Sequence, residues 1–269
     1  MLATDLVREG RLAEALAQVQ EDVRKSPANA SHRVFLFQLL SVMGAWERAA
    51  NQLAVVGELD AKTLPMVQTY GPTLNCEVFR GKVFSGEKVP LIFGDPEEWI
   101  AHLLEALRLT AQGKHAEANG LRESALEQAP ATAGQLDGTP FEWIADADSR
   151  LGPVCEAIVN GKYYWIPFHR LRTLVIEAPA DLRDCVWMPA QLTFANGGES
   201  VAFIPTRYPG SERHAEGLIQ IARKTDWNEV SAGVFLGLGQ RIFATDAGEF
   251  PIMDARRVDL QSGIPEGAA

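Results

Sequence analysis

The residue types needed for nucleophilic and acid–base chemistry gather in the second half of the chain. Cys155, His169, Asp181, Asp184 and Cys185 supply two thiols, an imidazole and two carboxylates. A cysteine whose proton is taken by a histidine is the nucleophile of many hydrolases and transferases. Such a pair requires contact in space, which sequence spacing does not provide, and cysteines are often simply buried. We therefore keep a hydrolase or transferase in this half, with the first half as a partner platform, as the alternative function.

Metal and cofactor sites are not indicated. Asp146 and Asp148 form a DxD pair, but no third ligand follows at a loop spacing, so pairing with Arg150 is the favoured interpretation. The glycines of AGVFLGLGQR (232–241) lack the following helix that a phosphate loop requires, and they indicate a bend in a strand. The histidines are scattered, without HExxH spacing. We predict no metal, no cofactor and no catalytic residue.

Three segments between residues 161 and 212 combine aromatic residues with proline, arginine and acidic residues: GKYYWIPFHRL, DLRDCVWMPAQL and IPTRYPGSE. Aromatic rings bury large areas and proline fixes φ, so these segments specify a rigid local shape. Charged groups within such sequence must be paired. They form either an internal ion-pair network or a groove that binds a partner. The candidate partner-binding residues are Tyr163, Trp165, Arg183, Trp187, Arg207 and Tyr208.

Composition excludes several classes of protein. The 269 residues are 46% hydrophobic and carry a net charge of −10, which describes a globular protein and disfavours nucleic acid or anionic membrane as partners. The N-terminal residues lack the apolar core of a signal peptide, and no apolar run is long enough to span a bilayer. Three cysteines without CxxC spacing indicate neither disulfides nor zinc. We expect a cytoplasmic protein.

The first half repeats a helical pattern. Gly10, Gly44 and Gly113 are each followed five residues later by alanine, and proline follows Gly10 and Gly113 at seventeen. This pattern matches the second helix of a tetratricopeptide repeat, in which glycine opens the turn and alanine permits close packing. We expect further helices over residues 32–43, 63–84 and 97–112, the last starting after Asp95-Pro96, and an interruption at 85–94. The prediction for residues 1–133 is a degenerate, tetratricopeptide-like α-α superhelix; an ordinary antiparallel bundle is the alternative.

Strand patterns replace helical patterns after a linker at residues 131–138. Asn160-Gly161 suits a type I′ turn between strands at 154–159 and 162–166. Further strands are expected at 171–177, 185–188, 191–194, 201–204, 234–244 and 251–254, and helices at 141–147 and 211–224. The prediction for residues 139–260 is an α+β domain with a small, partly closed antiparallel sheet, followed by a frayed tail at 261–269.

The motifs RLGPVCEAIVNGKYYWIPFHRL, DLRDCVWMPAQL, IPTRYPGSE and GLGQRIFATD, behind a helical repeat half, resemble the ImpE/TagJ (SciE-type) accessory proteins of type VI secretion systems. The resemblance covers nearly the whole chain. It implies a two-domain, non-enzymatic, virulence-associated adaptor without cofactors. Its implied partners are the N-terminal helix of the small sheath subunit and ClpV, the AAA+ ATPase that disassembles contracted sheaths. The resemblance carries over no binding residues.

A groove for such a helix has two candidate locations. An amphipathic helix is bound by an apolar groove that accepts anchors at i, i+3/i+4 and i+7. The concave face of the superhelix is one candidate, with Phe35, Phe37 and Trp46 as linings. The aromatic and arginine-rich second half is the other, and we favour it slightly.

Overall fold

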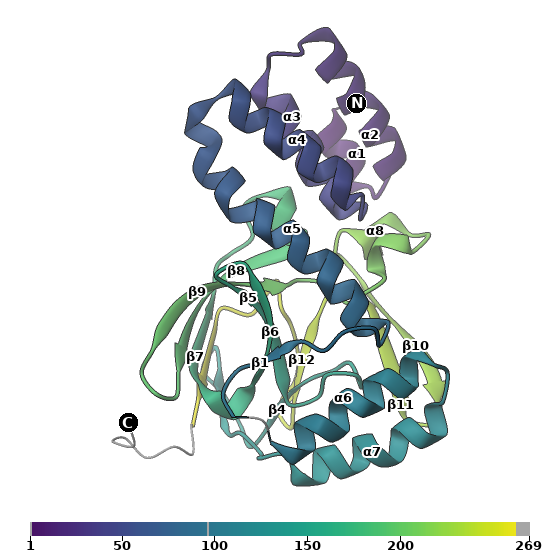
Figure 1. Cartoon of the computed structure of the whole chain (residues 1–269), viewed down its shortest axis with the longest axis vertical. Coiled ribbons are helices and arrows are strands. Elements are labelled where there is room, and N and C mark those ends of the chain that lie inside the picture. The colour runs from purple at the N-terminus through teal and green to yellow at the C-terminus, as the bar shows by residue number, and fades with distance from the viewer. Residues whose placement is uncertain (1, 96, 262–269) are drawn as a thin grey trace.

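The helices of the first half form hairpins that turn at glycine. The structure, a computed structural model, describes residues 2–95 and 97–261 (Figure 1). Its helix pairs are α1 (Ala3–Arg8) with α2 (Leu12–Lys25), α3 (Ala30–Val42) with α4 (Trp46–Leu59), and α6 (Glu98–Ala111) with α7 (His115–Gln128). Gly10, Gly44 and Gly113 have φ of 76°, 69° and 75°, a region open to glycine because it has no Cβ. The predicted helices and glycine turns are confirmed. Their assignment to the tetratricopeptide class stays a prediction.

One long helix connects these pairs to the rest of the molecule. α5 (Leu64–Phe84) follows the short 3-10 turn η1 (Ala61–Thr63) and has a proline in its first turn. The next helix α6, predicted over residues 97–112 after Asp95-Pro96, begins at Glu98 with Glu97 as N-cap. Pro96 itself lies outside the described residues. Among the described residues, no helix combines the length and hydrophobicity needed to cross a bilayer.

The main sheet is much larger than the sequence predicts. It has nine strands in the order β1-β6-β5-β9-β8-β7-β14-β2-β3, and all neighbours are antiparallel except β1 and β6. The edge strands are β1 and β3, which are not neighbours in this order, so the sheet is open. The strands are β1 (Leu91–Ile92), β2 (Gly134–Leu136), β3 (Thr139–Phe141), β5 (Val154–Val159), β6 (Lys162–Pro167), β7 (Leu171–Ile176), β8 (Trp187–Phe194), β9 (Glu199–Pro205) and β14 (Arg257–Leu260). The prediction of a small sheet was wrong because segments far apart in sequence, β1 and β14 among them, join it.

Two smaller sheets complete the second half. One pairs β10 (Thr225–Ser231) with β11 (Val234–Gly239), and the other joins β4 (Ile144–Asp146), β12 (Ile242–Thr245) and β13 (Gly248–Pro251). The helix predicted at 141–147 was wrong, since β4 pairs there with β12. The linker predicted at 131–138 contains β2. The helix predicted at 211–224 is only a 3-10 turn, η4 (Ser211–Arg213), and α8 (Gly217–Gln220).

The strands β5 and β6 are buried on both faces. Successive side chains of a strand point to opposite faces, and here they enter different hydrophobic clusters. Val154, Tyr163 and Trp165 pack in a cluster shared with the helices, whereas Cys155 and Ala157 pack in a cluster formed within the second half. The Asn160-Gly161 turn has φ of 50° and 69°, as the type I′ prediction requires.

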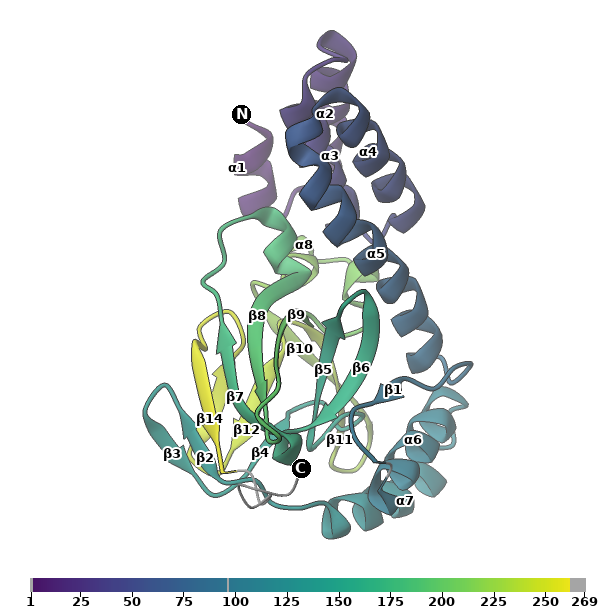
Figure 2. The same cartoon turned by 60° about the vertical axis from the view of Figure 1, so that its left-hand side comes forward.

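Helices and sheet therefore share one core. Figures 1 and 2 show α1–α4 at one end of the long axis, the sheet in the middle, and α6 with α7 at the other end. The shared cluster contains Phe37 and Leu74 from helices together with Trp187 from β8. The division into domains at 1–133 and 139–260 stays a prediction. Of the tail predicted to fray at 261–269, only Gln261 is described, and its N–H donates to the Ala133 carbonyl; residues 262–269 lie outside the described part.

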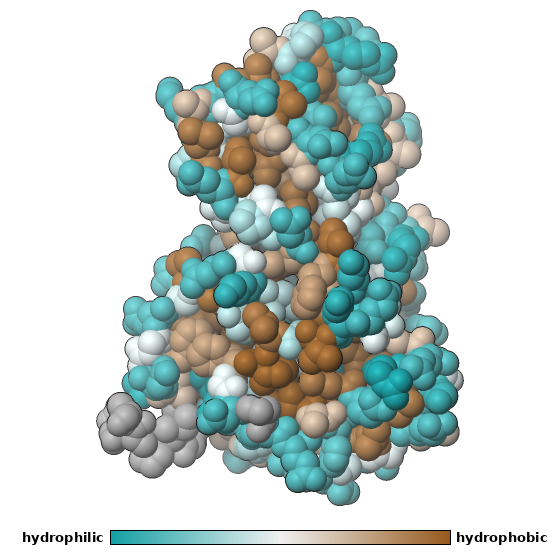
Figure 3. All heavy atoms as spheres, viewed as in Figure 1, coloured by the Kyte–Doolittle hydropathy of each residue, from teal (hydrophilic) through white to brown (hydrophobic). Residues whose placement is uncertain are grey.

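An apolar area surrounds the edge strand β1. Figure 3 shows hydrophobic side chains gathered over β1 and the adjoining end of α5. Val89 and Leu91 are among the exposed large hydrophobic residues. The segment 85–94, predicted to interrupt the helices, therefore folds back as a sheet edge.

Candidate functional site

Five of the six residues predicted to contact a partner lie in the interior. Tyr163, Trp165, Trp187, Arg207 and Tyr208 are each at most 3% exposed. Only Arg183 has substantial exposed surface; its guanidinium lies 4.8 Å from the centre of the Tyr70 ring and 2.5 Å from the Asp181 carboxylate. The structure brings most of these side chains into an internal network. Their partner-binding role stays a prediction, for which this conformation offers the surface of Arg183 alone.

Glu156 on β5 is the centre of that network. Its carboxylate accepts hydrogen bonds from Arg80 of α5 at 2.6 Å and 3.0 Å, and from Arg241 and the Tyr163 hydroxyl. Burial raises the pKa of Glu156, but the two guanidinium groups outweigh burial and lower the pKa to about 2. The carboxylate is thus held ionised, and it joins the longest helix to the sheet.

Arg207 ties two helix ends together. Its guanidinium donates to the carbonyls of Ser41 and Val42, at the end of α3, at 3.1 Å and 2.5 Å. The same group donates to the carbonyl of Gln220, the last residue of α8, at 2.5 Å. Terminal helix carbonyls lack intrahelical partners, so a buried guanidinium there satisfies them. Arg207 is therefore a structural connector between the two halves.

The residues predicted to line a concave helical face are also dispersed. Phe37 is fully buried, and Trp46 is half-buried with its ring 6.1 Å from that of Trp187. Phe35 is half-buried and lines a polar cavity between α1 and the sheet. These three side chains do not form one apolar groove.

The groups of the alternative, catalytic interpretation have other partners. His169 contacts the Glu97 carboxylate at 3.0 Å rather than a thiol. Burial raises the pKa of Cys155 to about 12 and of Cys185 to about 11, which disfavours the nucleophilic thiolate. Asp184 accepts hydrogen bonds from backbone N–H groups at the start of η3 (Leu182–Cys185).

The carboxylates of the DxD pair are bound to arginine. Asp148 pairs with Arg150 at 2.5 Å, as the sequence predicts, and Asp146 pairs with buried Arg241. Asp148 also accepts the N–H of Gly237, which places the GLG segment against it. Among the residues that the structure describes, no group of three or more His, Cys, Asp or Glu could hold a metal ion.

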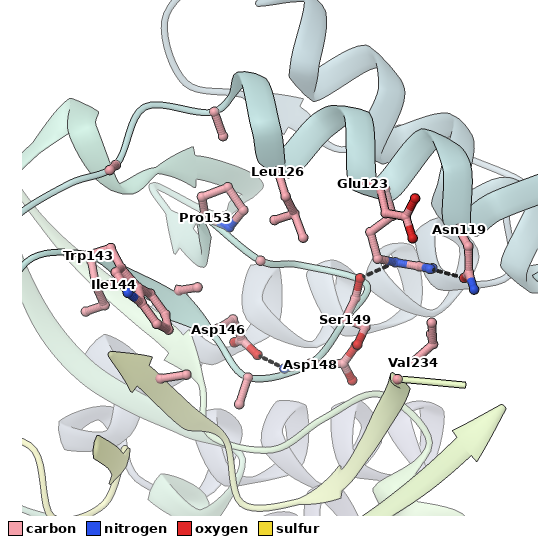
Figure 4. A pocket seen from close by; sticks show the side chains of 18 of the residues that line it. Asn119, Glu123, Leu126, Trp143, Ile144, Asp146, Asp148, Ser149, Pro153 and Val234 are labelled. Carbon is pink, nitrogen blue, oxygen red and sulfur yellow. Dashed lines mark hydrogen bonds between the residues drawn. The ribbon is translucent and has the colours of Figure 1, made fainter. Parts of the chain in front are cut away.

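An open apolar cleft lies between α7 and the sheets. Its volume is about 650 Å³, and its walls come from α7, the residues 129–131 after it, β4, the loop at 147–153 and the start of β11. Figure 4 shows Leu126 projecting from α7 toward the segment that carries Trp143 and Ile144. Trp143 and Leu126 are 41% and 49% exposed. A large aromatic ring with this much exposed area is a suitable anchor for a partner.

The floor of the cleft is fixed by Arg122 of α7. Its guanidinium donates to the Ser149 carbonyl at 2.7 Å and to Asn119 at 2.7 Å (Figure 4). It also donates to Thr110 at 3.0 Å. Burial lowers the pKa of Arg122, and Asp148 opposes that effect. Glu123 is the charged group of the lining without a hydrogen bond or ion pair to the described residues. The cleft is thus mainly apolar, with the Glu123 carboxylate as an acidic group of its lining.

Sequence reasoning missed Trp143 and Leu126. Trp143 lies in PFEWIAD, directly after the predicted linker, and a helix predicted there hid its exposure. Glu142 and Trp143 lie in the connection between β3 and β4, outside both strands, and both residues are exposed. Strand alternation therefore gave no signal for Trp143. Leu126 lies on α7, and the sequence alone did not show which face of that helix packs on the rest of the molecule.

This chain is similar to a known protein over almost its whole length. It is 54% identical over 261 residues to the type VI secretion system accessory component TagJ of Pseudomonas aeruginosa, covering 97% of this chain and 92% of that protein. Residues 138–259 match the family described as ImpE protein. The chain belongs to the ImpE family. The segment matched to ImpE contains Trp143, β4 and β11, and α7 completes the cleft from outside it.

The fold of this ImpE-family chain also occurs in a solved structure. The crystal structure of a Vibrio parahaemolyticus protein superposes with a TM-score of 0.88 at 25% sequence identity. The match covers 99% of this chain and 98% of that chain. Helical half and sheets therefore occur together in that protein as well.

Proposed function

We propose that this protein is a non-enzymatic adaptor of a type VI secretion system that binds the N-terminal helix of the small sheath subunit and links the sheath to the ClpV ATPase. The similarity to a type VI secretion accessory component over 97% of the chain carries the accessory role. The sheath helix and the ATPase are the partners that the motif resemblance implies. Among the described residues, no observation favours the alternative of a hydrolase or transferase, because His169 contacts Glu97 and burial raises the pKa of the Cys155 and Cys185 thiols.

The apolar cleft is the surface that we assign to the sheath helix. A helix-binding groove needs apolar walls that accept side chains spaced one turn apart, and polar groups at the rim that set orientation. Leu126 supplies an apolar contact from α7, and Trp143 supplies one from the segment before β4 (Figure 4). The free carboxylate of Glu123 at the rim favours a helix that presents a basic residue there.

The second partner requires a surface that does not overlap the cleft. α1–α4 lie at the opposite end of the long axis from α7 (Figure 1). Two proteins can therefore be held at once, which is what an adaptor between sheath and ATPase requires. We assign the ATPase to the helical end.

A labelled peptide of the sheath subunit's N-terminal helix tests the first assignment. Fluorescence anisotropy should show binding to the full chain, and Trp143→Ala should raise the Kd about tenfold or more because truncation of a central aromatic anchor commonly costs over 1 kcal/mol. Val201→Ser removes an apolar side chain that is 71% exposed on β9, away from the cleft, and should leave the Kd unchanged.

Two results would contradict the proposal in different ways. If the wild-type chain does not bind the peptide at tens of micromolar, the proposal that it recognises the sheath helix is wrong. Equal binding by wild type and the Trp143→Ala variant would keep the function but move the site, with Arg183→Ala as the next variant to compare. Pull-down of ClpV by the peptide-bound protein then tests the linking role.

A further inference from the structure

A second cavity, chemically unlike the apolar cleft, lies at the junction of helices and sheets. Its volume is about 670 Å³. Its walls come from α1, α3, the segment 179–185, the end of α8 and the turn at 253–256. These elements belong to both halves of the chain, so a ligand here would contact each of them.

The charges around this cavity are mainly positive. Arg8, Arg223 and Arg256 line it from three separate elements, in a chain whose net charge is −10. The acids of the lining are Asp181 and Asp254, and Asp181 is neutralised by Arg183 at 2.5 Å. The remaining charges are three guanidinium groups against one carboxylate.

These guanidinium groups are not equally engaged. Arg256 donates to the carbonyls of Ala255 and Met253, and Arg8 lies 3.8 Å from Asp5. The guanidinium of Arg223 has no hydrogen bond or ion pair to the described residues. Arginine presents a planar fork that matches a carboxylate or phosphate. Arg223 is thus available for an anion.

An amide side chain lines the same space. Gln38 of α3 is only 5% exposed as a residue, and its side chain lines the cavity without a hydrogen-bond partner among the described residues. Its amide atoms reach the solvent of the cavity rather than being enclosed by protein. The amide can donate to an anion directly. By contrast, Gln240 of the same lining is held on both sides by Ala222 and Met253.

Apolar side chains also line the cavity. Phe35, Leu182 and Ile221 are among them, together with Val7 and Met253. A ligand that combines a charged group with an apolar body therefore fits this lining. The volume is in the range of small-molecule sites.

We propose that this cavity binds a small organic anion, with a carboxylate or phosphate held by Arg223 and Gln38 and an apolar body against Phe35 and Leu182. The site is separate from the cleft assigned to the sheath helix and does not depend on that assignment. Because its walls come from both halves, an occupant would resist their separation.

Phenyl phosphate is the probe for the test, since it joins a dianionic head to an apolar ring. Titration calorimetry on the full chain should show one site, with inorganic phosphate binding at least tenfold more weakly and phenol not at all. Arg223→Gln and Gln38→Met should each raise the Kd for phenyl phosphate at least tenfold. Arg213→Gln, which alters a side chain 80% exposed on η4, is the matched control and should not change it.

The Gln38→Met variant also separates a ligand role from a structural role. Its thermal midpoint without ligand should match the wild type, because the amide has no protein partner to lose. A lowered midpoint would show that Gln38 serves the fold and would overturn its role in the site. Absence of phenyl phosphate binding at millimolar concentration would overturn the whole proposal, and so would binding that survives Arg223→Gln or is equalled by inorganic phosphate.

Discussion

At the scale of single residues, arginines from both halves pair with the carboxylates of the interior. Glu156 and Asp146 both contact Arg241, and Glu156 also contacts Arg80. A buried ion pair contributes little over an apolar replacement, but removal of one partner leaves an uncompensated charge. The network is therefore most sensitive to single substitutions at its centre.

Glu156→Gln should destabilise the protein by about 3 kcal/mol at pH 7, because the two buried guanidinium groups lose the carboxylate that they share and keep only Glu77 and Asp146 as counter-charges. The pKa of Glu156 is about 2 in the folded protein, below its ordinary value of 4.5. A depressed carboxyl pKa stabilises the fold above pH 4.5, and that stability is lost as pH falls toward 2. The difference between wild type and variant should hence shrink on acidification below pH 4.5.

Urea unfolding at pH 7 and at pH 3.5 measures this difference. Glu14→Gln is the matched control, because Glu14 is an exposed carboxylate beside Arg11 and its loss should change little. A Glu156→Gln variant as stable as the wild type at pH 7 would show that the arginines find other partners.

At the scale of elements, α8 is placed by close contact between two glycines. A Cβ on Gly217 would come within 1.9 Å of the Gly10 carbonyl oxygen, and a Cβ on Gly44 would come within 2.4 Å of Glu212. The turns of the first two helix hairpins thus pack directly on η4 and α8. This contact explains why residues 211–224 do not form the long helix that their sequence predicts.

Gly217→Ala should lower stability by about 1–3 kcal/mol, since the added methyl overpacks a backbone contact. Gly81→Ala is the control: nothing lies within 4 Å of its Cβ position in α5, so it should stabilise by about 0.5–1 kcal/mol through helix propensity. Thermal denaturation of both variants checks the pair. A neutral Gly217→Ala would mean that α8 can shift away from the hairpin turn.

Local sequence patterns predicted the turns well where the backbone conformation permits few residue types. Gly10, Gly44 and Gly113 predicted the hairpin turns, and Asn160-Gly161 predicted the β5–β6 turn, because φ > 0 restricts the residue type. The sheet size and the helices at 141–147 and 211–224 were mispredicted, since they depend on distant partners such as β12 and Gly10. The buried network was anticipated as one alternative, but the cleft around Trp143 depends on α7 and could not be assembled from sequence.

At the scale of the whole molecule, the shared core makes the two halves depend on one another. Residues 1–133 contribute Arg80 to Glu156 and the carbonyls of Ser41 and Val42 to Arg207. Trp187 donates to Glu77 across the same boundary at 3.1 Å. Removal of either half would expose these groups unpaired.

The full chain should consequently unfold in one cooperative step. Far-ultraviolet circular dichroism reports the helices, and tryptophan fluorescence reports six tryptophans, of which Trp165 and Trp187 lie on strands in the shared core. The two transitions should coincide in guanidinium chloride, and Arg207→Met should shift both to lower denaturant together. Loss of the helical signal before the fluorescence change would show independently stable halves.

The three glycine turns also differ in how much change they tolerate. Gly10 and Gly44 are pressed against α8 and η4, whereas no atom lies within 4 Å of the Cβ position of Gly113. The α6–α7 turn is thus the place to insert a fluorescent protein or an epitope for microscopy in living cells. A tag at either of the first two turns would disrupt the packing of the helix hairpins on α8 and η4. A tag at the third turn should leave the fold intact.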